Sequence, residues 1–255
     1  MEQGIHVVLA PEQLGSLWGI PITNTLITSW IVIALLVVLA FTIGTRLKMT
    51  PSRLQTLFEW LVEFIYDYVA EILESKALAR KFFPLLVTLF LFIFTANLLE
   101  FTPGIGSIGF FSAGGGSASG GHEFTPLLRS VNTDLNVTLA LAAIAFVVIE
   151  VTGIVVMGLG TYLHKFFPNP FKNPIGSVVG FIEVFSELAR LISFSFRLFG
   201  NILAGEVLIL VATYFIPYAG PVPLMAFEVF VGFIQAAIFA LLTLFFIKIA
   251  ITPAH

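Results

Sequence analysis

The sequence of 255 residues contains no cysteine, which excludes disulfide frameworks, thiolate metal sites and cysteine nucleophiles. Charge is also scarce: Asp, Glu, Lys and Arg make up 11% of the residues, against about 25% in soluble domains. The net charge of −3 is too small to suggest a nucleic-acid partner. Apolar side chains are abundant instead, with 58% hydrophobic residues and 28 phenylalanines. Because a soluble domain could not cover so much apolar surface, the composition predicts an all-α integral membrane protein.

Five apolar segments are long enough to cross a bilayer, which takes about 20 residues. The predicted spans cover residues 26–45, 82–101, 135–163, 176–214 and 225–251. The fourth is so long that it must exceed the thickness of one bilayer or tilt strongly. No tandem repeat is evident, so the whole chain is treated as one membrane domain, residues 1–255.

Residues 51–79 combine apolar and acidic side chains in a different way. The apolar residues recur at helical spacing and the five acidic ones fall elsewhere on the wheel, which predicts an amphipathic helix opened by Pro51. Such a helix lies on a membrane surface or runs beside another helix. Both settings remain open from the pattern alone.

The remaining segments are expected outside the bilayer. Residues 1–25 lack the basic start and cleavage site of a signal peptide, so we expect no processing and take the first span as the insertion signal. Residues 102–133 contain the Gly/Ser-rich run Ser112–Gly121, which is typical of a flexible loop.

Basic residues are distributed unequally between the two sides of the predicted membrane. Arg129 alone falls on the side of the N-terminus and the Gly/Ser-rich loop. Positive charge favours the cytoplasmic face, so the N-terminus is expected outside and the C-terminus in the cytoplasm. The basic residues on the cytoplasmic side would be Arg46, Lys48, Arg53, Lys76, Arg80, Lys81, Lys165, Lys172 and Lys248.

The fourth span carries charges that need a reason, because a charge at the bilayer centre costs roughly 3 to more than 10 kcal/mol. Glu183, Arg190 and Arg197 are seven residues apart and form one stripe, which Asn201 continues. Glu183 and Arg190 could instead extend to the interface, as Lys248 is expected to do. Arg197 lies about 30 Å along the helix, so a purely structural role is harder to assign to it.

The last span runs antiparallel to the fourth and places polar residues at matching depths. Gln235 is expected near the depth of Arg197, and Glu228 near that of Glu206 at the outer end. Gln235 could also serve only as an interhelical hydrogen-bonding group. Outer carboxylates can collect and pass protons, while a permanently charged arginine repels a cation and attracts a mobile carboxylate. This arrangement is typical of a cation pathway whose mobile carboxylate is supplied by a partner subunit.

Several motifs resemble one family. The run Ser195-Phe-Arg-Leu-Phe-Gly-Asn-Ile-Leu-Ala-Gly-Glu206 resembles the signature of subunit a of rotary F-type ATP synthases. The run Phe233-Ile-Gln-Ala-Ala-Ile-Phe-Ala-Leu-Leu-Thr243 is similar to the last helix of that family. Two shorter runs, Ala96-Asn-Leu-Leu-Glu-Phe-Thr-Pro103 and Asp134-Leu-Asn-Val-Thr138, are similar to further family patterns. The resemblance covers nearly the whole chain and is weakest in residues 1–21 and in the Gly/Ser-rich loop.

The resemblance implies a mechanism in which two offset half-channels pass protons to and from a rotating ring of c subunits. Arg197 would separate the half-channels, with Asn201 and Gln235 as polar neighbours. Glu206 and Glu228 would line the external half-channel, and Glu183 with Ser186 the exit half-channel. The two last spans would be tilted along the ring, and the amphipathic helix would contact the peripheral stalk b subunits.

The sequence departs from the family pattern at two positions. Many family members have a glutamate and a histidine at the positions of Glu206 and Glu228, whereas both residues are glutamates here. Two carboxylates in one low-dielectric site cannot easily both ionise, so the pair is expected to share a proton. Asp134 and Glu150 are also assigned to the proton pathway. Glu150 lies about 24 Å past Asp134 along the helix and could instead pair with Arg190.

Two other classes compete with this interpretation. A stand-alone transporter would need its own titrating group opposite Arg197 and a substrate site. An intramembrane enzyme would need a catalytic or metal-binding constellation, yet the four histidines fall in predicted loops or termini. We therefore expect a non-catalytic subunit without cofactor or metal, in an energy-transducing membrane such as the bacterial inner membrane. The histidines are His6, His122, His164 and His255.

Overall fold

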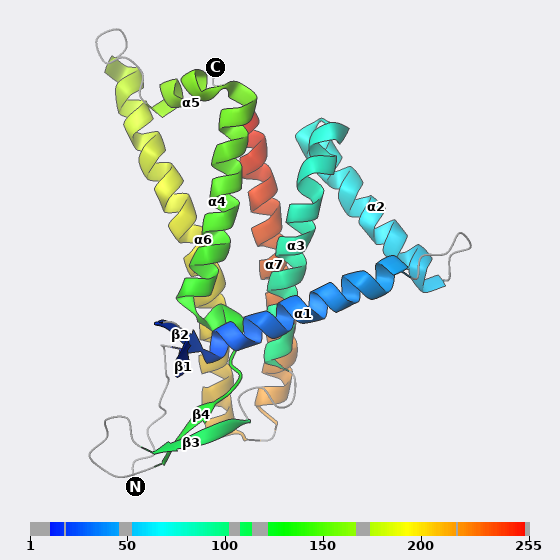
Figure 1. Ribbon diagram of the computed structural model, residues 1–255, viewed down its shortest axis with the longest axis vertical. Coiled ribbons are helices and arrows are strands. Elements are labelled where there is room, and N and C mark those ends of the chain that lie inside the picture. The colour runs from blue at the N-terminus through cyan, green and yellow to red at the C-terminus, as the bar shows by residue number, and fades with distance from the viewer. Residues whose placement is uncertain are drawn as a thin grey trace. The chain divides into compact units, whose positions relative to one another are not determined.

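The computed structural model describes residues 11–17, 19–45, 53–101, 108–113, 122–166, 174–217 and 219–252. Helices dominate this part of the chain (Figure 1), and five of them are long and apolar enough to cross a membrane. The all-α membrane fold is therefore confirmed. The five helices are α1 (Asn24–Thr45), α3 (Lys76–Glu100), α4 (Leu135–Met157), α6 (Pro174–Phe215) and α7 (Pro221–Ile251).

Two further helices and two hairpins complete the described elements. Helix α2 (Arg53–Leu73) is amphipathic, and α5 (Leu159–Phe166) is short. Strands β1 (Gln13–Leu17) and β2 (Ile20–Thr23) form one antiparallel hairpin, in which Leu17 pairs with Ile20. Strands β3 (Gly109–Ala113) and β4 (His122–Pro126) form the other, and the 3-10 helix η1 (Val131–Thr133) precedes α4.

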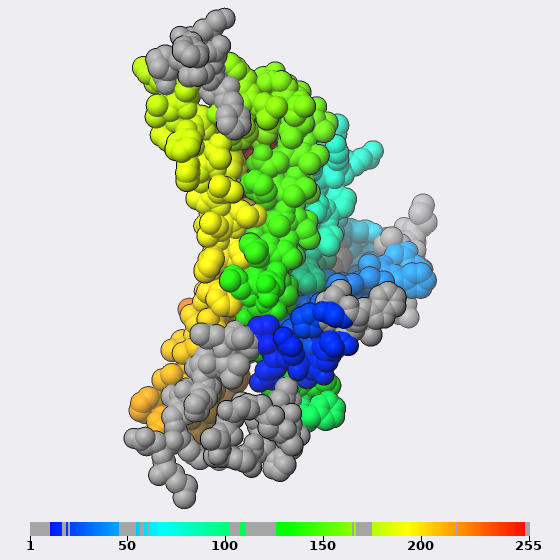
Figure 2. Space-filling model, turned by 60° about the vertical axis from the view of Figure 1, so that its left-hand side comes forward, coloured from blue at the N-terminus to red at the C-terminus, as the bar shows by residue number. Residues whose placement is uncertain are grey.

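The contacts divide the chain into two units, and α3, α4, α6 and α7 contribute to both. The first unit comprises residues 1–45, 91–137 and 198–236. Its small core contains Val32, Ala96 and Val131. In the space-filling view, the blue residues around the start of α1 lie against the green residues that lead into α4 (Figure 2).

The second unit comprises residues 46–90, 138–197 and 237–255. Its core joins α2, α3, α4 and α7 through side chains that are almost fully buried. Phe194 of α6 packs against the rings of Phe239 and Phe246 on α7. The core residues are Val69, Leu73, Ala79, Phe82, Leu86, Ile149, Leu244, Ile247 and Ala250.

The amphipathic helix and the second span meet at a different point from the predicted one. Helix α2 ends at Leu73, not at residue 79, because Glu74 adopts a left-handed backbone conformation with φ 52°. Helix α3 then begins at Lys76 instead of residue 82, and the Ser75 hydroxyl accepts a hydrogen bond from the Leu78 amide at 3.4 Å. This is the geometry of a helix N-cap. Pro51 lies outside the described residues.

The predicted third span, residues 135–163, is two helices. Helix α4 ends at Met157 and Gly158 takes a φ of 81°, which a residue with a side chain rarely adopts. Helix α5 then turns back, so that Tyr162 lies over Gly153. The apolar run continues through the break, so hydropathy alone did not reveal it.

Helix α6 has 42 residues and α7 has 31, or about 63 and 46 Å at 1.5 Å per residue. Both exceed the bilayer core of about 30 Å. Helix α7 begins at Pro221, four residues before the predicted start of the last span at residue 225. Proline suits the first position of a helix because the amide there needs no partner.

The segments expected outside the bilayer are only partly described. Of the segment 1–25, residues 1–10 and residue 18 lie outside the described residues, while Gln13–Leu17 and Ile20–Thr23 form the β1–β2 hairpin and α1 begins at Asn24. Of the predicted flexible loop, residues 102–107 and 114–121 lie outside them. The flanking residues form the β3–β4 hairpin and η1, so the described part of this loop is ordered structure.

Candidate functional site

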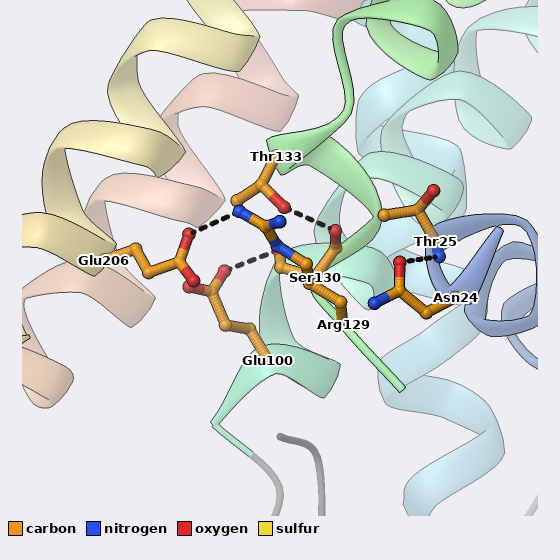
Figure 3. A network of polar contacts seen from close by, with 7 residues as sticks. All are labelled: Asn24, Thr25, Glu100, Arg129, Ser130, Thr133 and Glu206. Carbon is orange, nitrogen blue, oxygen red and sulfur yellow. Dashed lines mark hydrogen bonds and ion pairs between the residues drawn. The ribbon is translucent and has the colours of Figure 1, made fainter. Parts of the chain in front are cut away.

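Three carboxylates and one arginine gather within the first unit, and Figure 3 shows two of these carboxylates, Glu100 and Glu206, beside Arg129. Glu206 comes from α6, Glu100 from the end of α3, and Arg129 with Ser130 from the segment before η1. Arg129 Nη2 lies 3.6 Å from Glu206 Oε2, and Ser130 Oγ donates a hydrogen bond of 2.8 Å to Glu100 Oε2. We call Glu100, Glu206 and Glu228, together with Arg129 and Ser130, the carboxylate cluster.

Glu228 of α7 is the most buried carboxylate of the cluster, at 5% exposure. Its carboxyl group rests on Gly205, where a Cβ atom would overlap it. Its Oε1 atom is buried without a hydrogen-bond partner among the described residues. Glu100 interacts electrostatically with Glu206, Glu228 and Arg129. Glu206 and Glu228 therefore both lie near Glu100, and their predicted roles in proton transfer stay predictions.

The segment that carries Arg129 is held in place by α1. Asn24 Nδ2 donates to the Pro126 carbonyl at 3.3 Å, and Thr25 Oγ1 donates to Asp134 Oδ2 at 2.7 Å. Between these two anchors, the Arg129 amide donates to Thr28 Oγ1 at 3.3 Å. The guanidinium is therefore positioned by backbone anchored on both sides, with its side chain only 10% exposed.

Asp134, predicted in the proton pathway, makes the contacts of a helix cap. Its Oδ1 accepts the Asn136 amide at 2.9 Å, which caps α4, while Oδ2 accepts from Thr25. Both oxygens are engaged, which favours a positioning role over proton transfer.

Asn97 anchors α7 through hydrogen bonds of its side-chain amide. Its Nδ2 donates to the Gly232 carbonyl at 3.1 Å, and its Oδ1 accepts from Asn132 Nδ2 at 2.6 Å. Gly232 lies one turn after Glu228, and its Cα approaches the Asn97 side chain closely. Asn97 therefore fixes the stretch of α7 that presents Glu228.

Arg197 has quite different surroundings within the second unit. Its side chain is exposed, and Nη2 is 3.5 Å from Ser193 Oγ on the preceding turn of α6. The neighbouring residues Leu188, Ile192 and Phe196 are each at least half exposed. We call these three residues with Arg197 the Arg197 face. Phe194 and Ser195 point the other way and are buried.

Asn201 and Gln235 were predicted as neighbours of Arg197. They fall in the first unit and Arg197 in the second, so this proximity stays a prediction. The Nδ2 atom of Asn201 is buried without a hydrogen-bond partner among the described residues. Gln235 is partly exposed.

The other charged residues of α6 differ in their contacts. Arg190 pairs with Glu187 one turn away, and its guanidinium lies 3.9 Å from the centre of the Phe246 ring. Glu183 is half-buried. Ser186 is exposed and donates its hydroxyl to the Ile182 carbonyl at 3.0 Å. The stripe predicted from the spacing therefore changes from half-buried at Glu183 and Arg190 to exposed at Arg197.

Glu150 of α4 binds Tyr162 of α5 instead of Arg190. The Tyr162 hydroxyl donates to Glu150 Oε2 at 2.6 Å. Burial, reinforced by this hydrogen bond, raises the pKa of Tyr162, so the phenol remains a donor. The other oxygen of Glu150 is buried without a hydrogen-bond partner in the described part of the chain.

Sequence reasoning missed Glu100, Arg129 and Ser130. Two signals could have found them: Arg129 is the one basic residue on its side of the predicted membrane, and Glu100 lies within the Ala96–Pro103 motif. Together the cluster offers carboxyls that can hold and exchange protons beside a guanidinium that stays charged.

The comparisons with known proteins agree on one family. The family described as ATP synthase A chain matches residues 26–248. "ATP synthase subunit a" of Moorella thermoacetica is 32% identical over 93% of this chain and 94% of its own length. "ATP synthase subunit a 3" of Pelobacter propionicus is 32% identical over 98% of this chain and 96% of its own. "ATP synthase subunit a" of Citrifermentans bemidjiense is 32% identical over 91% of this chain and 89% of its own.

Proposed function

This chain belongs to the ATP synthase A chain family, and from that premise we propose that it forms the proton path of an F-type ATP synthase. The chain is a membrane subunit of the proton-translocating sector and is not catalytic alone. In the proposal, two offset half-channels carry protons to and from carboxylates on a ring of c subunits. Proton flow is thereby coupled to ring rotation and to ATP synthesis or hydrolysis.

The exposed position of Arg197 carries the proposal. A permanent positive charge in the middle of a long apolar helix cannot face lipid without a large free-energy cost. Within the second unit, Arg197 is surrounded on α6 by exposed apolar side chains, and it donates a hydrogen bond to Ser193 on the preceding turn. A partner surface that is apolar and carries a carboxylate would satisfy both features. A ring of c subunits is such a partner, whereas a stand-alone transporter would need an acidic group of its own here.

The carboxylate cluster supports a role in the external half-channel. Glu206 is 39% exposed, so water can reach it, while Glu228 is buried beside it. A proton arriving from outside could pass from the more accessible carboxyl to the buried one. Arg129 offsets part of the negative charge, which lets three carboxyls occupy one small volume.

We assign Glu183, Ser186 and Glu150 to the exit half-channel. Glu183 and Ser186 lie on α6 before Arg197, and Glu150 presents a buried oxygen without a hydrogen-bond partner among the described residues. Asn201 and Gln235 would shield Arg197 and orient it toward the ring. In this scheme Asp134 holds the start of α4 and transfers no proton.

The proposal includes a location and partners. The chain would lie in a bacterial inner membrane with its N-terminus outside and its C-terminus in the cytoplasm, as the distribution of basic residues predicts. Its partners would be the c ring, the b subunits of the peripheral stalk and the surrounding lipid. Helix α2, with its amphipathic surface, is the element proposed to contact the stalk.

The test is ATP-driven proton pumping by the assembled complex with Arg197→Ala. We expect assembly to persist and pumping to fall below detection. Arg80→Ala, which removes an exposed arginine from α3, is the matched control and should pump normally. Coupled pumping near the wild-type rate in Arg197→Ala would overturn the proposal.

A further inference from the structure

The second unit has a groove between the start of α3 and the second half of α4. It encloses about 260 Å³, and Figure 2 shows the cyan residues of α3 beside the green ones of α4 there. Leu78, Lys81 and Phe82 line it from α3. The other side consists of α4 residues between Val147 and Val156. Neither the proton path nor the Arg197 face uses these residues.

The lining is suited to a hydrocarbon chain. Seven of its nine side chains are apolar, and Val147, Val151 and Val155 recur every four residues along α4. These three valines are each about half exposed or more, so the groove is open along its length. Thr152 donates its hydroxyl to the Val148 carbonyl at 2.6 Å, so it offers the groove no hydrogen. An apolar chain is the ligand that such a wall can bind without leaving a polar group unpaired.

The end of the groove is positively charged. Lys81 lines it there, and the exposed residue Lys76 lies in the first turn of α3. The acidic residue nearest in sequence, Glu74, is paired with Lys248 at 3.0 Å. Basic groups at the end of an apolar groove between membrane helices are complementary to a lipid with an anionic headgroup.

We propose that this groove binds one anionic phospholipid, with an acyl chain along the valines of α4 and the phosphodiester at Lys81. The site does not depend on the proton path. A zwitterionic lipid would fill the apolar wall equally well but would gain less from Lys81, because its headgroup carries no net charge.

The experiment uses the assembled complex in vesicles that contain phosphatidylglycerol or phosphatidylcholine with a diazirine in the acyl chain. Light-induced labelling of residues 147–156 is then quantified by mass spectrometry. We expect the phosphatidylglycerol probe to label this stretch about fivefold more, the factor that corresponds to about 1 kcal/mol for one basic residue at a membrane surface. Lys81→Gln should remove this preference, whereas Arg80→Gln, which lies outside the lining, should retain it.

A second pair of variants separates the groove from general surface charge. Val151→Trp fills the groove and should abolish labelling by both probes, while Ile144→Trp, on an exposed part of α4 outside the lining, should not. Equal labelling by the two probes in the unsubstituted complex would overturn the proposal. So would equal losses in Lys81→Gln and Arg80→Gln, or crosslinking of the groove to a helix of another subunit. These readouts are independent of pumping, so they can fail while the proposed function stands.

Discussion

The carboxylate cluster and the Arg197 face both depend on α6, yet they differ in how much of their chemistry this chain supplies. In the cluster, charged groups are paired or buried by other parts of the same chain, as Arg129 is with Glu206. On the Arg197 face, a permanent charge lies exposed among apolar side chains, with Ser193 one turn away. The cluster already contains its counterion, whereas the Arg197 face lacks a carboxylate partner in the described part of the second unit.

This contrast separates two kinds of function. A group that must take up and release protons has to reach water and to be held close to its neighbours. The hydrogen bonds that anchor the segment around Arg129 hold this arginine in place beside the carboxyls. A group that must meet a succession of partners has to be presented on a surface. The difference therefore predicts that substitutions in the cluster impair proton delivery, while substitutions on the Arg197 face impair the separation of the two half-channels.

The largest effect expected within the cluster is that of Glu206→Gln. A glutamine keeps the size of the side chain but cannot exchange a proton, so pumping should fall by about 100-fold, the scale of a lost acid–base group. ATP-driven acidification of inverted vesicles measures this. Glu74→Gln, an exposed acidic residue outside the cluster, should pump normally. Unchanged pumping in Glu206→Gln would place the delivery route elsewhere.

A smaller effect is expected when the cluster is disturbed only by volume. Gly205→Ala would place a methyl group where the Glu228 carboxyl lies, so the end of this flexible side chain would have to move. The displaced carboxyl should lower the pumping rate, with only a small loss of thermal stability. Gly44→Ala, at a position in α1 with open space around it, should lower neither. If the two variants behave alike, the close contact between Gly205 and Glu228 does not affect pumping.

The smallest of these effects is a change in pH dependence. Glu228→Gln removes one of three carboxyls that repel one another when ionised; Glu100 and Glu206 remain, with Arg129 opposite them. With one of the mutually repelling carboxyls removed, the acid limb of the pumping profile should move to lower pH. Superimposable profiles for this variant and the unsubstituted complex would show that the carboxyls do not share a proton.

Much of the fold could be predicted because hydropathy reports directly on membrane helices. The five spans follow from apolar runs, and Arg197 is conspicuous as a charge deep within one. The break at Gly158 could not be predicted in this way, since the residues on both sides of it are apolar. The turn depends on backbone conformation and on the packing of Tyr162 over Gly153, which are tertiary features.

The candidate site was predicted only in part for a similar reason. Glu206 and Glu228 lie on the two long helices, where helical geometry relates depth to sequence. Arg129 and Ser130 lie in an irregular segment, which no periodicity describes. Their contribution depends on long-range hydrogen bonds such as that between Asn24 and Pro126, 102 positions apart.

The most direct test is passive proton conductance through the membrane sector after removal of the catalytic part of the ATP synthase. It compares Arg197→Ala with Glu206→Gln in vesicles under an imposed potential. The division of roles between the two regions predicts opposite changes: conductance rises in Arg197→Ala because the barrier between half-channels is lost, and falls in Glu206→Gln because delivery is blocked. A conductance that falls equally in both variants would contradict it, since the two regions would then serve one step.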